Sequence, residues 1–171
     1  MDIDNDELLE QELIKEIGLV MKKTAKNIHY EVTKNIEEIV YDPYEPQVYK
    51  RLKDAEGGYL DSWTYKEQKE SRSRSISYIV ESEASRMISE SPHHASPDGE
   101  DRREVMTESI IRGINWDYSY KSKKAGQKAW WKYPRNFWTP TISIITDDYF
   151  KQTVQREIYR NTGWYLGIGT E

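Results

Sequence analysis

Apolar residues near the start of the chain recur every three or four positions, which is the spacing of one helical face. The series runs Leu9, Leu13, Ile17, Val20, Thr24, Ile28, Val32, Ile36 and Ile39. It predicts one helix over about 5–40, capped by Asp4 or Asn5 and ended by Pro43, since the residue before a proline is pushed out of the helical region. Such a helix is roughly 50 Å long. We therefore expect the end at 1–12 to project or to pack on a neighbour.

Period-two alternation further on predicts two strands. They cover about 62–67 and 73–81, with 67–73 as the hairpin connection between them. In the second strand Ile76, Tyr78 and Val80 alternate with serines and Ile79, which is typical of a half-buried strand.

A tyrosine and proline ladder separates the long helix from these strands, VYDPYEPQVYKRLKDAEGGYLDSW over 40–63. We expect 41–49 to be extended, because two prolines fix φ and remove backbone donors. Gly57-Gly58 marks a turn. The ladder carries rigid aromatic side chains and no catalytic motif, which favours a role in contacting another surface.

The second half predicts two more helices. One covers about 101–113, with Val105, Met106, Ser109 and Ile110 facing inward. The last begins at Thr139-Pro140 and ends at Asn161 to Gly163. Its expected apolar stripe consists of Ile142, Ile145, Tyr149, Val154 and Ile158. The segment 117–137 has no clean period and is expected to form an extended basic, Trp-rich loop, and 164–171 is expected to be a tail.

The composition leaves little apolar material for a core. Of 171 residues 36% are hydrophobic and 32% charged, and mean hydropathy is −0.92. Much of the apolar content is 13 Tyr and 6 Trp, against 2 Phe, and Tyr and Trp are common at protein interfaces. The length predicts a single domain, 1–171, which completes its burial on copies of itself or on partners. The alternative is a small core with ordinary surface tyrosines.

Charge is distributed unevenly along the chain. The acidic start, MDIDNDELLEQE, has no features of a secretory signal, and no window is apolar enough for a membrane span. A basic stretch from 118 to 146 contains Lys121, Lys123, Lys124, Lys128, Lys132 and Arg135 and no acid. The two regions could meet across a subunit boundary, or both could be solvated surface. A net charge of −5 argues against nucleic-acid affinity of the whole molecule.

Motifs for catalysis or cofactors are not evident. Without cysteine there is no disulfide, thiolate nucleophile or Cys-based zinc site. His93, His94 and Asp98 match no metal-ligand spacing, and no nucleophile elbow or phosphate-binding loop is present. We therefore expect a protein that is not an enzyme and has no cofactor or metal. A hydrolase using a clustered acid pair is a distant alternative.

Basic and aromatic residues are interleaved in Lys128-Ala-Trp130-Trp131-Lys132-Tyr133-Pro134-Arg135. Such a segment can neutralise phosphates and stack bases, which gives a nucleic-acid-binding accessory protein using 119–135 as the alternative function. Against the acidic background we favour an interface arm. The candidate interface residues along the chain are Tyr41, Tyr44, Tyr49, Arg51, Trp63, Trp130, Trp131, Lys132, Arg135, Phe137 and Trp138.

Three motifs together resemble one protein family. Tyr44-x-Pro46-x-x-Tyr49-x-Arg51, followed by Glu56-Gly57-Gly58-Tyr59-Leu60-Asp61, resembles the signature of the tail-completion, or head–tail joining, proteins of tailed bacteriophages. The segment from Glu108 to Tyr118 is similar to that family's short helix with its Gly-Ile turn. Tyr133-Pro134-Arg135-Asn136-Phe137 is similar to its Pro-Arg-Pro-Phe motif, with Asn in place of the second proline. The resemblance covers most of 10–160.

The resemblance implies a fold and a function. It implies an α+β subunit with a small antiparallel sheet flanked by a long N-terminal helix, a short middle helix and a C-terminal helix. It also implies a virion neck protein, assembled in the host cytoplasm, that forms a ring, commonly sixfold, between the portal connector and the tail. The expected partners are further copies of the chain and the adjacent connector, stopper and tail proteins. Genomic DNA would pass through the lumen without specific binding, and no membrane is involved.

Overall fold

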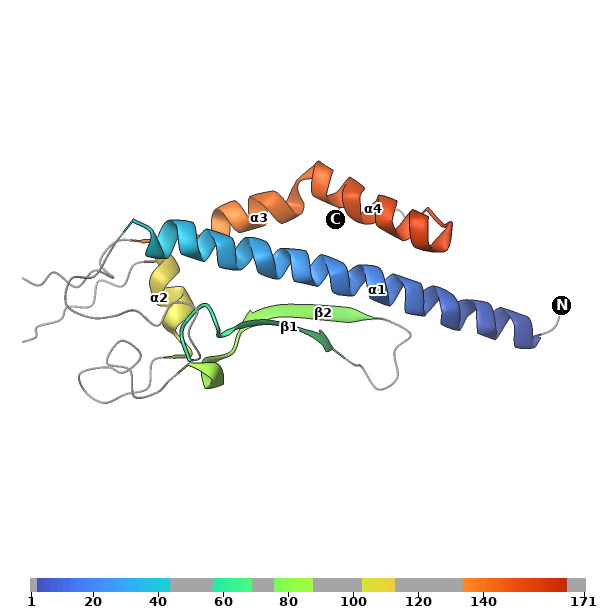
Figure 1. The fold of residues 1–171 in the computed structure, drawn as a ribbon, viewed down its shortest axis with the longest axis horizontal. Coiled ribbons are helices and arrows are strands. Elements are labelled where there is room, and N and C mark those ends of the chain that lie inside the picture. The colour runs from blue at the N-terminus through green and yellow to red at the C-terminus, as the bar shows by residue number, and fades with distance from the viewer. Residues whose placement is uncertain (1–2, 44–56, 69–75, 88–102, 113–133, 166–171) are drawn as a thin grey trace, which may run out of the picture. The chain divides into compact units, whose positions relative to one another are not determined.

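The computed structural model describes residues 3–43, 57–68, 76–87, 103–112 and 134–165. Its elements are α1 (Ile3–Ile36), the π-helical turn η1 (Glu37–Tyr41), β1 (Trp63–Gln68), β2 (Ser77–Ser82), the 3-10 turn η2 (Ala84–Arg86), α2 (Met106–Arg112), α3 (Trp138–Thr146) and α4 (Asp148–Thr162) (Figure 1). This confirms the predicted α+β class, with a long N-terminal helix and a two-stranded antiparallel sheet. The chain divides into two compact units: unit 1 is 1–31, 64–81 and 141–171, and unit 2 is 32–63 and 82–140.

The long N-terminal helix confirms the prediction from periodicity. It runs for 34 residues as α1 and continues as η1 to Tyr41. In η1 the amide of Asp42 donates to the Glu37 carbonyl oxygen at 2.9 Å, the longer-range bond of a π turn. The helix ends at Tyr41, before Pro43, as predicted. The predicted reason was wrong, because Asp42, the residue before the proline, keeps helical dihedrals (φ −61°, ψ −37°). The predicted cap was wrong, because α1 already begins at Ile3 and both Asp4 and Asn5 lie within it.

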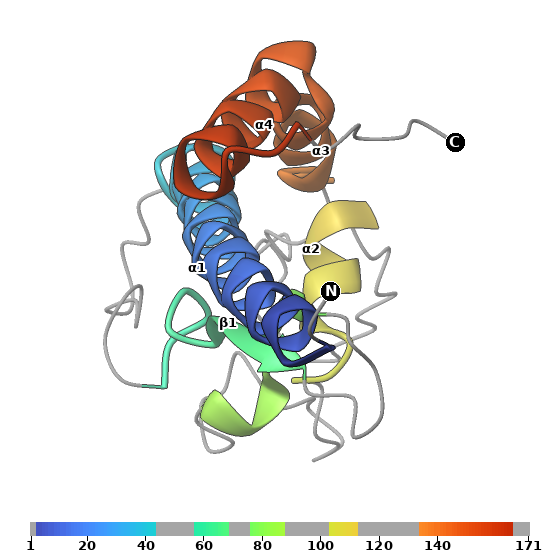
Figure 2. The same ribbon diagram turned by 90° about the vertical axis from the view of Figure 1, so that its right-hand side faces the viewer.

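In unit 1, α1 lies between the hairpin and α4, as the two perpendicular views agree (Figures 1 and 2). On the α4 side, Lys23 Nζ contacts Glu157 Oε2 at 2.7 Å. On the hairpin side, the His29 and Tyr65 rings lie 5.6 Å apart. A Cβ at Gly18 would stand 2.9 Å from Ile76 Cδ1, so the absence of a side chain there lets the hairpin approach the helix closely.

The hairpin is antiparallel, with its strands slightly displaced from the predicted ranges. Ser77 Oγ donates to the Gln68 carbonyl oxygen at 3.3 Å at one end, and the Glu83 amide donates to the Ser62 carbonyl oxygen at 2.8 Å at the other. Every residue of β2 is half-buried, so the predicted alternation does not separate a buried face from an exposed one. The half-buried character itself is confirmed.

The core of unit 2 gathers side chains from segments far apart in the sequence. The buried members are Val32, Ile36, Val40, Tyr41, Tyr59, Trp63, Met87, Met106, Ile110 and Phe137. The predicted turn at Gly57-Gly58 is confirmed. There Gly57 has φ 82° and its amide donates to Asp61 Oδ2 at 3.3 Å. The turn brings Tyr59 and Trp63 into the same core.

The middle helix is shorter than predicted. It covers Met106–Arg112, and 103–105 form a turn before it. Arg103 Nη1 donates to the Met87 carbonyl oxygen at 2.8 Å, which ties this turn to the segment after η2. Met106, Ser109 and Ile110 are buried as predicted, but Val105 is exposed, so its predicted inward position was wrong.

The last predicted helix is two helices. Asp147 is extended (ψ 145°) between α3 and α4, and it caps α4 by accepting from the Tyr149 amide. The predicted cap at Thr139-Pro140 was wrong, because Asn136 Oδ1 accepts from the amides of Trp138 and Thr139 at 3.1 and 3.0 Å. The predicted end is confirmed by Gly163, whose φ of 72° closes α4.

Candidate functional site

The sequence-predicted interface residues divide into three groups in the structure. Six lie outside the described residues: Tyr44, Tyr49, Arg51, Trp130, Trp131 and Lys132. Tyr41, Trp63 and Phe137 are buried within unit 2. Arg135 is half-buried, and Trp138 is 37% exposed. Among the predicted residues that the structure describes, Trp138 is thus the one with most surface available to a partner.

Trp63 is the centre of an aromatic cluster. Its ring meets Tyr59 edge-on at 6.3 Å and Phe137 edge-on at 5.9 Å, and it is tilted against Trp138 at 6.2 Å. Edge-to-face aromatic pairs stabilise a fold beyond the area they bury. The buried part of the ladder, together with the segment before α3, therefore stabilises the protomer itself.

Arg135 joins two helix ends in unit 2. Its Nη1 donates to the carbonyl oxygen of Val40 in η1 at 2.6 Å, and its backbone amide donates to the carbonyl oxygen of Ile110 in α2 at 2.9 Å. A guanidinium at a helix C-terminus is favoured by the helix dipole. With Asn136 capping α3 and Phe137 fully buried, the Pro-Arg-Asn-Phe segment forms a structural junction.

The nucleic-acid alternative depended on 119–135. The structure describes only Pro134 and Arg135 of that range, and one Arg135 Nη atom already donates to a backbone carbonyl. The His93, His94 and Asp98 group also lies outside the described residues.

Tyr59 is predicted to make stability sensitive to alkaline pH. Burial raises the pKa of this phenol well above its ordinary value of 10.0, although its hydrogen bond to Thr107 Oγ1 at 3.0 Å acts in the opposite direction. The unfolded chain therefore loses this proton first. Stability from Tyr59 is fully present below about pH 10 and falls above it by about 1.4 kcal/mol per pH unit.

Urea unfolding of the wild type and Tyr59→Phe at several pH values checks this. The variant is expected to lose about 1 kcal/mol at neutral pH, for the missing hydrogen bond, and to show a shallower decline above pH 10. The control is Tyr165→Phe, at a tyrosine that is 78% exposed. Equal slopes for wild type and Tyr59→Phe would contradict the prediction.

An exposed aromatic and basic surface lies along α4. We call it the α4 outer face: Tyr149, Gln152, Arg156, Tyr159 and Arg160, followed past the cap by Trp164 and Tyr165. Tyr149 is 71% and Trp164 57% exposed. The opposite side of α4 carries the buried Ile158 and the half-buried Val154. Tyr, Trp and Arg are the residue types most enriched at interface hot spots.

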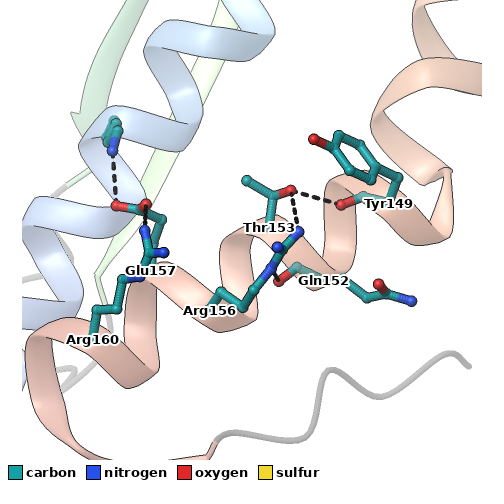
Figure 3. A network of polar contacts seen from close by, with 7 residues as sticks. Tyr149, Gln152, Thr153, Arg156, Glu157 and Arg160 are labelled. Carbon is teal, nitrogen blue, oxygen red and sulfur yellow. Dashed lines mark hydrogen bonds and ion pairs between the residues drawn. The ribbon is translucent and has the colours of Figure 1, made fainter.

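Polar contacts hold several side chains of this face in place (Figure 3). Arg156 lies over the Tyr149 ring at 6.0 Å, and its Nη2 donates to Thr153 Oγ1 at 3.4 Å. Arg160 Nη1 donates to Glu157 Oε1 at 3.3 Å. A hydrogen bond from Lys23 of α1 to Glu157 lowers the pKa of that carboxyl. The Glu157 side chain is therefore an ionised carboxylate between Lys23 and Arg160. The arginines are thus oriented before any partner binds.

A second exposed surface lies at the N-terminal end of α1, which extends beyond the end of α4 (Figure 1). We call residues 7–12 the α1 tip. Leu8 and Leu9 are 61% and 59% exposed, and Glu7 and Glu12 are exposed beside them. A projecting helix end was predicted from the helix length.

Sequence reasoning missed the α4 outer face. It placed Tyr149 and Ile142 on an inward apolar stripe, whereas both are exposed, and this was wrong. The signal that could have revealed the face is the spacing of Tyr149, Arg156 and Arg160 by seven and four residues, which places them on one side of a helix.

Comparisons with known proteins give the family. A search of the curated proteins and a search of the solved structures found no significant match. In the described ranges, no helix is both long and apolar enough to cross a membrane, and no three potential metal ligands gather in one place. The YomN family model matches residues 5–160. The chain therefore belongs to the YomN family, a phage-associated protein family.

Proposed function

We propose that the protein is a virion structural subunit of a tailed-phage neck, which forms a ring that joins the head to the tail. The α4 outer face carries this proposal. A surface of exposed Tyr, Trp and oriented Arg side chains is typical of sites that bind other proteins. The phage-associated family supplies the setting in which such a subunit would work.

The proposed partners follow from a ring in this position. Copies of the chain contact each other around the ring, most simply with sixfold symmetry, and its two rims contact the connector and tail proteins. The acidic chain, with net charge −5, repels DNA phosphates, so the genome passes through the lumen without binding. In this role the protein has no enzymatic activity, cofactor or metal.

Deletion of the gene from the phage that encodes it tests this function. We expect DNA-filled heads and separate tails that fail to join, with joining restored by the gene in trans. Mass spectrometry of purified wild-type virions should detect the protein, and imaging should place it at the neck. Intact infectious particles from the deletion strain, or virions that lack the protein, would overturn the proposal.

A further inference from the structure

We propose that the α1 tip of one copy docks on the C-terminal half of the α4 outer face of the next copy. The inference rests on the proposed ring assembly and names its contact surface. Both surfaces belong to unit 1. Each copy carries both patches, so the contact can repeat head-to-tail from copy to copy, and such contacts generate rings when the rotation closes.

Both surfaces present exposed apolar side chains that could be buried against each other. The tip presents Leu8 and Leu9, each more than half exposed at the end of a projecting helix. The α4 outer face presents Tyr159 at 50% exposure, packed against Tyr165 with ring centroids 5.4 Å apart. Leucine side chains on a rigid aromatic platform bury apolar area at a low cost in side-chain entropy.

Charge selects the pairing. Glu7 and Glu12 are exposed on the tip, and Arg156 and Arg160 are exposed on the α4 outer face. The guanidinium of Arg160 donates to Glu157 through one nitrogen at 3.3 Å, and its side chain is 71% exposed, which leaves further donors for a carboxylate. Asp147 and Asp148 lie at the other end of α4, so the basic half is the half around Tyr159.

The same charges disfavour symmetric alternatives. Two tips brought together would oppose glutamates, and two α4 outer faces would oppose arginines. Like charges across an interface cost several kcal/mol. Tip-to-face pairing avoids both penalties. A reciprocal two-fold pair would meet the same charges, and the ring proposed above requires the repeated, one-way form of the contact.

Charge reversal with complementation tests the contact. The tip variant is Glu7→Lys with Glu12→Lys, and the face variant is Arg156→Glu with Arg160→Glu. Each alone should weaken self-association, measured by sedimentation velocity, by about 100-fold or more. An equimolar mixture of the two variants should assemble again. The lysine tip of the tip variant then docks on the glutamate face of the face variant, and the native tip of the face variant docks on the native face of the tip variant. The chain carrying all four changes should also assemble. Thermal melting of each variant checks that it folds.

Crosslinking supplies a second measurement in a chain that has no cysteine. Leu8→Cys mixed with Tyr159→Cys should give disulfide-linked pairs under mild oxidation. Leu19→Cys, at a 53% exposed α1 position outside the tip, mixed with Tyr159→Cys should not. Absence of the first crosslink, or no restoration in the mixture, overturns the docking. If the wild type assembles while single reversals change nothing, the docking fails and the ring stands. A wild type absent from virions overturns the proposed function itself.

Discussion

Phe137→Ala is expected to lower the free energy of unfolding by about 3–5 kcal/mol, the range for large-to-small changes of a buried aromatic residue. Phe137 is fully buried, and its ring meets Trp63 at 5.9 Å and Trp138 at 6.5 Å, both edge-on. Removing it leaves a cavity at the centre of the unit 2 core. Since domains are stable by only about 5–15 kcal/mol, this single change should bring the protein close to unfolding.

Urea unfolding followed by tryptophan fluorescence measures this loss, because Trp63 lies against the cavity. Trp138→Ala is the matched control: it neighbours Phe137 but is 37% exposed, so its loss should be clearly smaller. Phe137→Leu retains most of the apolar volume and should fall between the two. A Phe137→Ala loss no larger than that of Trp138→Ala would show that the cluster does not support the core.

Arg135→Met is expected to cost about 1.5–3 kcal/mol, the usual contribution of a hydrogen bond from a charged group. The change removes the 2.6 Å bond from Nη1 to the carbonyl oxygen of Val40, a residue that is only 1% exposed. It keeps the aliphatic stem and the backbone bond from residue 135 to Ile110. The end of α1 and its π turn should therefore loosen first.

Hydrogen exchange of the amides at 36–42, read beside urea unfolding, measures the effect of Arg135→Met. Arg135→Lys tests whether the shape of the guanidinium matters, because a lysine retains the charge without the planar fork of donors. We expect this variant to lose less stability than Arg135→Met but more than none. Lys151→Met, on α4 in unit 1, is the control and should leave these amides unchanged. Unchanged exchange in Arg135→Met would mean that the arginine does not hold the helix end.

The sequence predicted the elements whose signal is local. The period of the first helix is long and uninterrupted, so α1 and its end before Pro43 could be predicted. The hairpin and the turn at Gly57 followed from alternation and from glycine. The site was harder to predict. A tyrosine looks the same in a pattern whether it packs inward, as Tyr59 does, or points outward, as Tyr149 does.

The break between α3 and α4 could not be predicted from periodicity. Apolar residues continue through it, and Asp147 was an ordinary polar position in the pattern. Its extended backbone, and the hydrogen bond that its side chain accepts from the Tyr149 amide, start a new helix at Asp148. Within that helix Tyr149 comes nine residues before the buried Ile158, which places the two side chains on opposite sides. A single capping residue can end one helix and begin the next despite the apolar pattern, because its side chain accepts from a backbone amide that the start of the helix would otherwise leave without a partner.

By itself, the sequence determined that the chain is α+β, that its first helix is longer than a small domain requires, and that Tyr and Trp supply much of its apolar surface. These properties follow from spacing and composition, so they do not depend on how the helices and strands pack together. Only the tertiary structure decided which aromatics are core and which are surface. Trp63 and Phe137 are buried because the turn at 57–62 and the junction at Arg135 bring distant segments together, whereas Tyr149 and Tyr159 are exposed because α4 packs on α1 through its other side.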